Sequence, residues 1–392
     1  MASSQRSWSL SSLPLDLIEE IFHRTPAESL LRSKPTCKKW RHLIDNKRFI
    51  YEHLRRFPEQ RRFLRIDETV QVMDPVRRTR SETPIPYELQ PLDNIKAMVH
   101  CDGVMLCMCS DMGSRFVTLS LWNPLTRHIA LIQPSTRFTT SDHYGIGYGI
   151  DKYRDGYKIL RFSDRRYFEI YYCGTSSWRT LDDAEVDWSV DFRCQGVSVM
   201  GNMYWLAHRF FHEEEEEEDE EEDEEEEEVE SFILGFDFTA ETFMEVWFCP
   251  PYNYDDENNY LSCFDGDRLS LLLQDKEVPS VIEVWVSSKL PDDVSFTKYF
   301  RVVNPGLPWL RIDRSETASH PVYYIAKSKR IVAWCENVVV LEGGRLPVCT
   351  ILYEIDEGGV VAQHETERHE DNDYIGTFLC GYVYVPSLVP LP

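Results

Sequence analysis

Short strand-like phrases recur along most of this chain at an interval of about 48 residues, and this repeat constrains the fold more than any other feature. In each phrase a run rich in β-branched and aromatic residues reaches a turn residue, and a second such run follows. Four of them are LWNPLTRHIAL from Leu121, IYYCGTSSWRTL from Ile170, LGFDFTAETFMEVW from Leu234 and IEVWVSSKLPDDVSFTKYFRV from Ile282. Their anchors near residues 123, 173, 237 and 285 are about 50, 64 and 48 residues apart, and the middle interval becomes about 48 without its acidic insertion.

This interval suits one four-stranded blade of a β-propeller, a fold in which every small sheet packs on its two neighbours. The residues beyond Pro58, excluding the insertion, number about 315 and predict six or seven blades. Closing the ring would protect the sheet edges from pairing with other chains.

The first sixty residues have helical periodicity instead. Apolar residues at helical spacing predict a helix that begins near Leu13 and Pro14 and ends near Phe22. Thr25 is expected to cap a second helix, with Pro26 at its first position, and Pro35 to end it. A third helix carries Cys37, Trp40, Leu43 and Ile44, and Asn46 caps a fourth with Ile50, His53, Leu54 and Phe57. A module this small has little core, so its surplus apolar surface indicates a partner.

The run LPLDLIEEIFHRTPAESLLRSKPTCKKWRHLI resembles an F-box, the motif that docks onto a Skp-type adaptor bound to a cullin. The residues that match the family's apolar, anchoring or basic positions are Leu13, Pro14, Leu17, Ile18, Ile21, Leu30, Leu31, Cys37, Lys38, Trp40, Leu43 and Ile44. The resemblance implies that these twelve residues bind the adaptor, with Arg41 beside Lys38 on a basic rim. Thr25, Pro35 and Thr36 depart from the pattern. A three-helix DNA-binding domain also fits a basic surface, but no helix has the Arg, Asn or Gln cluster that reads base edges.

Later phrases resemble the type-1 F-box-associated domain of plant F-box proteins, which is a kelch-related β-propeller. They include HCDGVMLCMC from His100, YGIGYGIDKYRDGYKILRF from Tyr144, GVSVMGNMYWLA from Gly196 and YVPSLVPLP from Tyr384. The predicted fold is therefore α+β multidomain, with a small helical F-box at residues 8–57 and an all-β propeller-like domain at residues 60–392.

Charge is distributed unevenly along the chain. Residues 213–228 supply sixteen of the 25 net negative charges, whereas the first 80 residues hold seventeen Lys or Arg against ten Asp or Glu. Like charges repel and cannot bury apolar surface, so the run predicts a disordered loop between two strands. It is either a solvated insertion without a partner or a contact for a basic protein such as a histone. The basic N-terminus suits an acidic partner.

Three motifs suggest chemistry but have simpler explanations. His100, Cys101, Cys107 and Cys109 include zinc-ligand types, yet their spacing predicts a hairpin at Asp102-Gly103 with two core cysteines. Gly145, Gly147 and Gly149 have no following helix to bind a phosphate, so a closely packed strand is expected. None of the eleven cysteines has a nucleophile's context. We therefore expect no catalytic residues, cofactor or metal.

The resemblance implies a substrate-recognition subunit of a Skp-cullin-F-box (SCF) ubiquitin ligase, which binds a Skp-type adaptor and, through it, a cullin. A protein substrate would bind one propeller face, where Trp188, Tyr252, Tyr254 and Tyr260 are candidate contacts. No secretion signal or membrane segment is evident, so a nuclear or cytoplasmic location is expected and neither membrane nor nucleic acid is an expected partner. The alternatives are a tethering or chromatin-associated factor outside a ligase and, last, a kelch-type metal oxidase.

Overall fold

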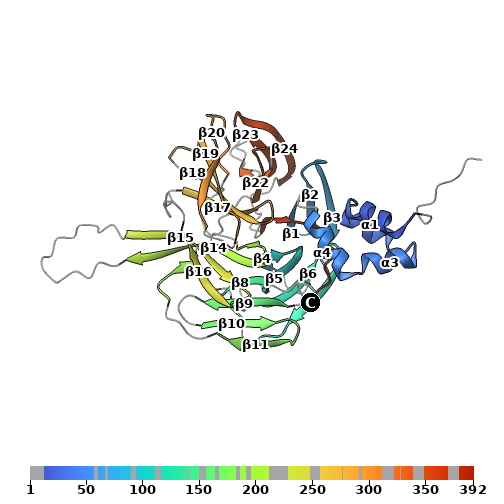
Figure 1. The fold of residues 1–392 in the computed structure, drawn as a ribbon. Coiled ribbons are helices and arrows are strands. Elements are labelled where there is room, and N and C mark those ends of the chain that lie inside the picture. Colours follow the sequence, from blue (N-terminus) through green and yellow to red (C-terminus); the bar gives the residue numbers. More distant parts are fainter. Residues whose placement is uncertain are drawn as a thin grey trace, which may run out of the picture.

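The computed structural model describes most of the chain from residue 13 onward. The described residues are 13–56, 61–66, 69–89, 94–110, 116–136, 138–139, 141–149, 156–163, 167–181, 186–190, 196–211, 228–247, 257–275, 277–290, 294–310, 322–326, 328–338, 348–369 and 379–392. The fold consists of a small helical module and a ring of antiparallel sheets (Figure 1).

The helical module contains α1 (Leu15–His23), α2 (Ala27–Ser33), α3 (Lys38–Ile44) and α4 (Lys47–Arg56). Pro14 and Pro26 directly precede the first two helices, where the missing proline N–H leaves no bond unmade. Asn46 caps α4 as predicted, since its side-chain oxygen accepts a hydrogen bond from the Phe49 N–H at 3.3 Å.

The predicted cap at Thr25 is wrong. The Thr25 hydroxyl donates to the Ile21 carbonyl at 2.8 Å and so satisfies the last turn of α1, while α2 begins after Pro26 without a side-chain cap. A threonine between two helices can serve the helix before it or the helix after it. The sequence pattern does not distinguish the two roles.

Six sheets form the propeller, and each has neighbouring strands paired antiparallel. The first blade contains β25 (Leu379–Tyr384), β1 (Arg62–Ile66), β2 (Thr69–Asp74) and β3 (Thr79–Pro84), and the second contains β4 (Asn94–Cys101), β5 (Val104–Ser110), β6 (Thr118–Asn123) and β7 (His128–Ile132). The third contains β8 (His143–Tyr148), β9 (Tyr157–Ser163), β10 (Tyr167–Tyr172) and β11 (Ser177–Thr180), and the fourth contains β12 (Ser189–Val190), β13 (Val197–Val199), β14 (Asn202–Phe211), β15 (Glu228–Asp237) and β16 (Thr242–Val246). The fifth contains β17 (Glu257–Phe264), β18 (Arg268–Asp275), β19 (Val281–Ser287) and β20 (Phe296–Val303), and the sixth contains β21 (Val322–Ala326), β22 (Arg330–Val338), β23 (Val348–Asp356) and β24 (Gly359–His369).

The ring closes by joining the two ends of the propeller in one blade. The last strand, β25, pairs antiparallel with β1, and Arg62 faces Tyr384 while Ile66 faces Leu379. The predicted fold class is therefore confirmed. Of the six or seven blades that the sequence predicted, the ring has six.

Each of the four repeated phrases forms the outer hairpin of one blade. The first becomes β6 and β7, the second β10 and β11, the third β15 and β16, and the fourth β19 and β20. Two more outer hairpins, β2–β3 and β23–β24, were not recognised in the sequence although they use the same turn chemistry. The side chains of Asp74 and Asp356 accept backbone N–H bonds at these turns, as Asn123 and Asp237 do in their own blades.

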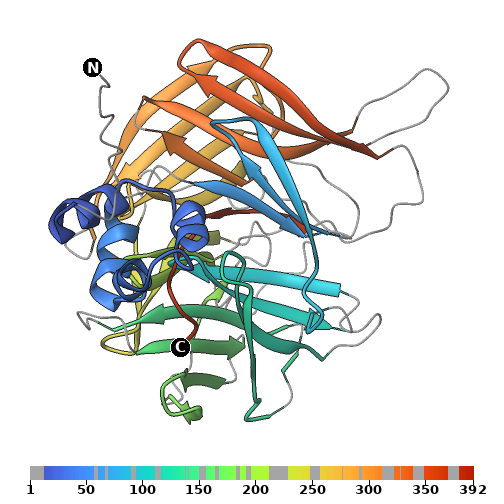
Figure 2. The same ribbon diagram turned by 90° about the vertical axis from the view of Figure 1, so that its right-hand side faces the viewer.

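The helical module shares one hydrophobic core with the propeller. Ile18, Phe22 and Phe49 belong to the same buried cluster as Tyr148 and Val389, and that cluster extends through the second, third and fourth blades. The helices lie on the propeller face where the chain also ends (Figures 1 and 2). The module is therefore seated on the propeller rather than connected to it by a linker alone.

Several local predictions are confirmed. The β4–β5 hairpin turns at Asp102 and Gly103, both with positive φ, and Cys107 and Cys109 are fully buried. Gly147 lies in β8, where a Cβ would collide with the Gly201 carbonyl and the Phe238 ring. The β14–β15 strands pair out to Phe211 and Glu228, and residues 213–227 of the acidic run lie outside the described part of the chain.

We predict that Asn123→Ala lowers the free energy of unfolding by about 2–4 kcal/mol. Asn123 is fully buried, and its amide donates to the carbonyls of Ser387 at 3.1 Å and Val389 at 2.7 Å while its oxygen accepts two turn N–H groups. The variant would leave these groups buried without partners. Chemical denaturation of both proteins measures the difference. Asn304→Ala is the matched control, since Asn304 makes similar turn bonds at the surface, and an equal loss in both variants would contradict the prediction.

Candidate protein-interaction face of the helical module

Helix α1 presents apolar side chains on its solvent side as well as on its core side. Ile18 and Phe22 are each 5% exposed, whereas Leu15, Leu17 and Ile21 are 56%, 48% and 41% exposed. One apolar face of a helix suffices to bury it in its own domain. The second face is therefore available to a partner, and we call Leu15, Leu17 and Ile21 the α1 face.

The structure separates the twelve predicted adaptor residues into three groups. Pro14, Leu17, Ile21 and Lys38 are exposed; Leu13, Leu31, Cys37, Trp40 and Leu43 are partly buried; and Ile18, Leu30 and Ile44 are buried. The α1 face thus contains two of the predicted residues, Leu17 and Ile21, together with Leu15, which was not predicted. Leu15 lies next to Pro14, and this position was the available signal, but the helical periodicity did not include it among the apolar positions.

The three buried residues form the interior of the module. Leu30 is 0% and Ile44 is 1% exposed, so neither contacts a partner in this arrangement. Phe22 packs edge-on against Trp40 with ring centroids 5.2 Å apart, which links α1 to α3. Ile18, Leu30 and Ile44 therefore hold the helices together in this structure, and adaptor binding by the twelve residues stays a prediction.

A basic rim lies beside the apolar residues. Lys38, Lys39 and Arg41 are exposed on α3, and the first turn of this helix has no acidic residue. The backbone N–H groups of Trp40 and Lys39 point to the thiol of Cys37 and lower its pKa. This part of the module therefore presents positive charge to an approaching partner.

Ion pairs hold the ends of the module in place. Glu20 on α1 accepts from Arg24 at 2.9 Å and from Arg56 on α4 at 2.9 Å, and the bonds from Arg56 and then Arg24 lower the pKa of Glu20. Lys34 pairs with Asp45 and connects the ends of α2 and α3. These pairs are exposed, so they orient helices more than they stabilise them.

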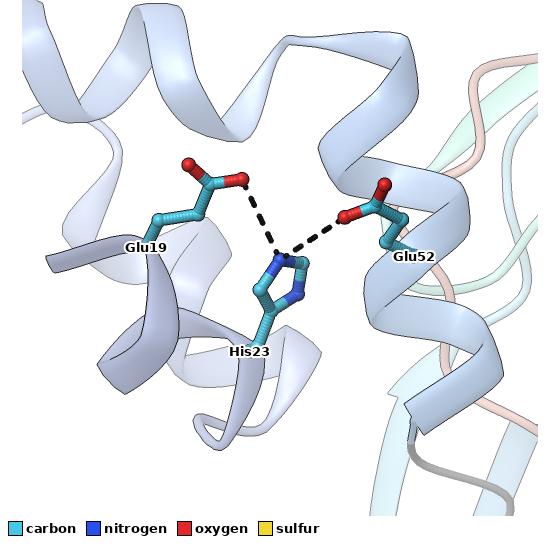
Figure 3. A group of neighbouring side chains, drawn as sticks. All are labelled: Glu19, His23 and Glu52. Atoms are coloured by element: carbon cyan, nitrogen blue, oxygen red, sulfur yellow. Dashed lines mark ion pairs between the residues drawn. The ribbon is translucent and has the colours of Figure 1, made fainter. Parts of the chain in front are cut away.

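Glu19, His23 and Glu52 form the one group of possible metal ligands found among the described residues (Figure 3). The His23 Nε2 lies 3.7 Å from Glu19 Oε1 and 3.6 Å from Glu52 Oε2, with α1 supplying two residues and α4 the third. The imidazole is 2% exposed and stacks on Phe49 at 4.6 Å.

This group does not fit a metal well. A ligating histidine ordinarily donates its second ring N–H to an acceptor, but the buried His23 Nδ1 has no hydrogen-bond partner among the described residues. Arg48 also binds Glu52 Oε1 at 2.8 Å. Burial and then the charge of Arg56 lower the pKa of His23, against the opposing effect of the three glutamates. The arrangement fits a neutral imidazole whose Nε2–H points between two carboxylates.

The four aromatic residues named as candidate substrate contacts are either buried or lie outside the described residues. Trp188 is 5% and Tyr260 is 7% exposed, so both are core residues; Tyr252 and Tyr254 lie outside the described residues. Trp188 packs against Phe243 at 5.2 Å. Aromatic rings fill the contacts between blades, and burial removes both residues from the set of candidate contacts.

Two other aromatics are exposed instead. Tyr87 is 78% exposed beyond β3, and Trp247 is 48% exposed beyond β16, where its ring lies tilted against Phe232 with centroids 5.4 Å apart. Both strands run from the helical module toward the opposite side of the ring, so these side chains lie away from the α1 face. The β14–β15 hairpin also projects to that side (Figure 1).

Among the described residues, no helix has the length and apolar character needed to cross a membrane.

Comparison with known proteins gives consistent results for both parts of the chain. The profile of the F-box domain matches residues 10–52, and that of the F-box associated beta propeller domain matches residues 56–391. The chain is 44% identical to Putative F-box only protein 15 of Arabidopsis thaliana, with 100% of both chains covered. It is 38% identical to F-box/WD-40 repeat-containing protein 1 of the same plant, covering 100% of this chain and 92% of the relative.

Similarity to solved structures is lower. A chain of a nidogen/laminin complex matches at a TM-score of 0.38 and 10% identity, covering 83% of this chain and 99% of the other.

We predict that acid destabilises the protein partly through His23. Its folded-state pKa lies below the ordinary value of 6.5, so below pH 6.5 the unfolded chain takes up a proton that the folded chain refuses. The His23 contribution to stability is therefore complete above pH 6.5 and is lost as the pH falls toward the folded-state pKa.

Denaturation of wild type and His23→Gln between pH 7.5 and 5 measures this contribution. The wild type should lose more stability with acid than the variant does. His42→Gln is the control, because His42 is exposed on α3. If wild type and His23→Gln have the same pH dependence, the imidazole is not held neutral by burial.

Proposed function

Because this chain belongs to the plant F-box proteins that carry an F-box-associated β-propeller, we propose that it is the substrate-recognition subunit of an SCF-type ubiquitin ligase. F-box proteins with a propeller are typical SCF substrate receptors, and F-box domains generally bind Skp1-type adaptors. In this proposal the helical module binds the adaptor and, through it, a cullin. The propeller binds a target protein for ubiquitination.

The observation that supports this function best is the α1 face. Three large aliphatic side chains, Leu15, Leu17 and Ile21, are 41–56% exposed on a helix whose other face is already buried. Leaving them in water costs free energy that a partner interface would recover. Pro14 and partly buried Leu13 border the same helix, and the basic rim on α3 suits an acidic partner.

The shared core supports a receptor that holds its substrate in a fixed position. The module's Phe49 and the propeller's Tyr148 lie in one buried cluster, so the adaptor and a substrate on the opposite face would keep a constant separation. A receptor of this kind contributes effective concentration and leaves ubiquitin transfer to other subunits. Members of this family are typically non-catalytic adaptors, and we propose the same for this chain, in the nucleus or the cytoplasm.

We predict that Leu17→Ala combined with Ile21→Ala weakens binding to a Skp-type adaptor by roughly 30- to 1000-fold, which corresponds to about 2–4 kcal/mol for two apolar anchors. Both side chains are exposed, so the variant should fold like the wild type. Titration calorimetry with purified adaptor measures the dissociation constant. Val76→Ala is the matched control, because Val76 is 75% exposed on the first blade.

The same proteins can then be tested for cullin in a pull-down. Wild type should retain both adaptor and cullin, and the double variant should retain neither. Wild type that retains adaptor without cullin would favour the tethering role outside a ligase. Wild type that does not bind the adaptor would contradict the proposed function altogether.

A further inference from the structure

Arg61 is a buried cation for which the described residues provide no carboxylate partner. It precedes β1 directly, is 8% exposed, and places its guanidinium 5.4 Å from the centre of the Tyr324 ring. Within the described part of the chain it donates no hydrogen bond and forms no ion pair.

Two other arginines with little solvent exposure have carboxylate partners. Arg161 is 1% exposed and pairs with Asp142 at 2.9 Å and with Glu169 at 3.2 Å. Arg62, next to Arg61, pairs with Asp74 at 3.1 Å. Removing an unpaired charge from water costs several kcal/mol, so Arg61 requires a different explanation.

Arg61 lies near the axis of the propeller. Its charge acts on His100 in β4, on Cys263 in β17 and on Tyr324 in β21. These strands begin three different blades and line the centre of the ring. The ring contact with Tyr324 places the guanidinium toward the centre of the ring, and its position before β1 places it at the end that faces the helical module.

The groups near Arg61 include both neutral and charged ones, since the charges of Glu354, Arg62 and Asp74 also act on Tyr324. Burial lowers the pKa of His100 to about 4, so the ring is neutral at physiological pH, and it is hydrogen-bonded to the backbone of Val383 in β25. The His100 Nδ1 is buried and has no hydrogen-bond partner among the described residues. Burial raises the pKa of the Cys263 thiol, which therefore keeps its proton. His100 and Cys263 therefore add no competing positive charge beside Arg61.

We propose that Arg61 binds a small oxyanion, a phosphate or carboxylate group of a free small molecule, at the end of the propeller axis beneath the helical module. A guanidinium binds such groups through two parallel N–H bonds. A small molecule fits this place better than a protein, because the helices and the chain's last residues lie over this face of the ring (Figure 2). The site would join the two parts of the receptor, since the chain passes from α4 to β1 at Arg61.

The experiment uses the full chain, with inorganic phosphate and citrate as probes against chloride at matched ionic strength. Thermal denaturation and ³¹P line broadening with phosphate report binding. Arg61→Met should weaken binding by at least about tenfold, the effect of losing one charged bidentate contact. Arg77→Met removes the same charge at an exposed position and should leave binding unchanged.

If Arg61→Met does not fold, Arg61→Lys serves in its place. It keeps the charge, loses the paired geometry and should still bind more weakly than the wild type. The proposal is overturned if neither probe binds the wild type, or if phosphate stabilises Arg61→Met as much as the wild type. Either outcome would identify Arg61 as a hydrated cation stacked on Tyr324. Adaptor binding is measured separately through the α1 face, so loss of one activity leaves the other testable.

Discussion

The antiparallel pairing of β25 with β1 is the contact on which the rest of the structure depends. It joins residues more than 300 positions apart, and the entropy of closing so long a loop is repaid only when all the intervening blades are in place. It also removes two free sheet edges. Because β25 is antiparallel to β1, the chain enters the ring and leaves it on the same face. The helices that precede β1 and the tail that follows β25 therefore meet there.

That meeting explains how a module of four short helices obtains a sufficient core. Helices of seven to ten residues are marginal alone, but Ala27, Leu30 and Phe49 join a cluster that includes Leu388 and Val389 of the tail. Asn123 holds the tail against the second blade through both of its carbonyl contacts. The inner face of α1 is satisfied by this core and its outer face is not. The helices and the propeller therefore share one core, and the apolar side chains of the α1 face stay on the surface.

Much of the fold could be predicted because its signal is periodic. The outer hairpins repeat with the blades, and an Asx residue accepting turn N–H groups marks several of them. What failed were assignments that depend on neighbours distant in sequence. Trp188 could be a surface or a core residue until the third and fourth blades packed together. The error at Thr25 is different, because this residue lies between two helices and is close enough to serve either of them. Likewise, helical spacing identified Ile18 and Leu17 as apolar positions without separating the buried one from the exposed one.

Charged residues show the same difference between properties that can be read from the local sequence and contacts that depend on the fold. Net charge says little about the interior, whereas strand register determines which ions meet. Arg161 faces Glu169 across β9 and β10, Arg209 faces Glu230 across β14 and β15, and both pairs form ion pairs. Arg61 stands one residue before β1, outside the ladder that pairs Arg62 with Tyr384. Among the described residues, no strand pairing places a carboxylate opposite it. The burial of this charge near the helical module therefore follows from the closure of the ring, which brings the start of β1 beside the end of β25.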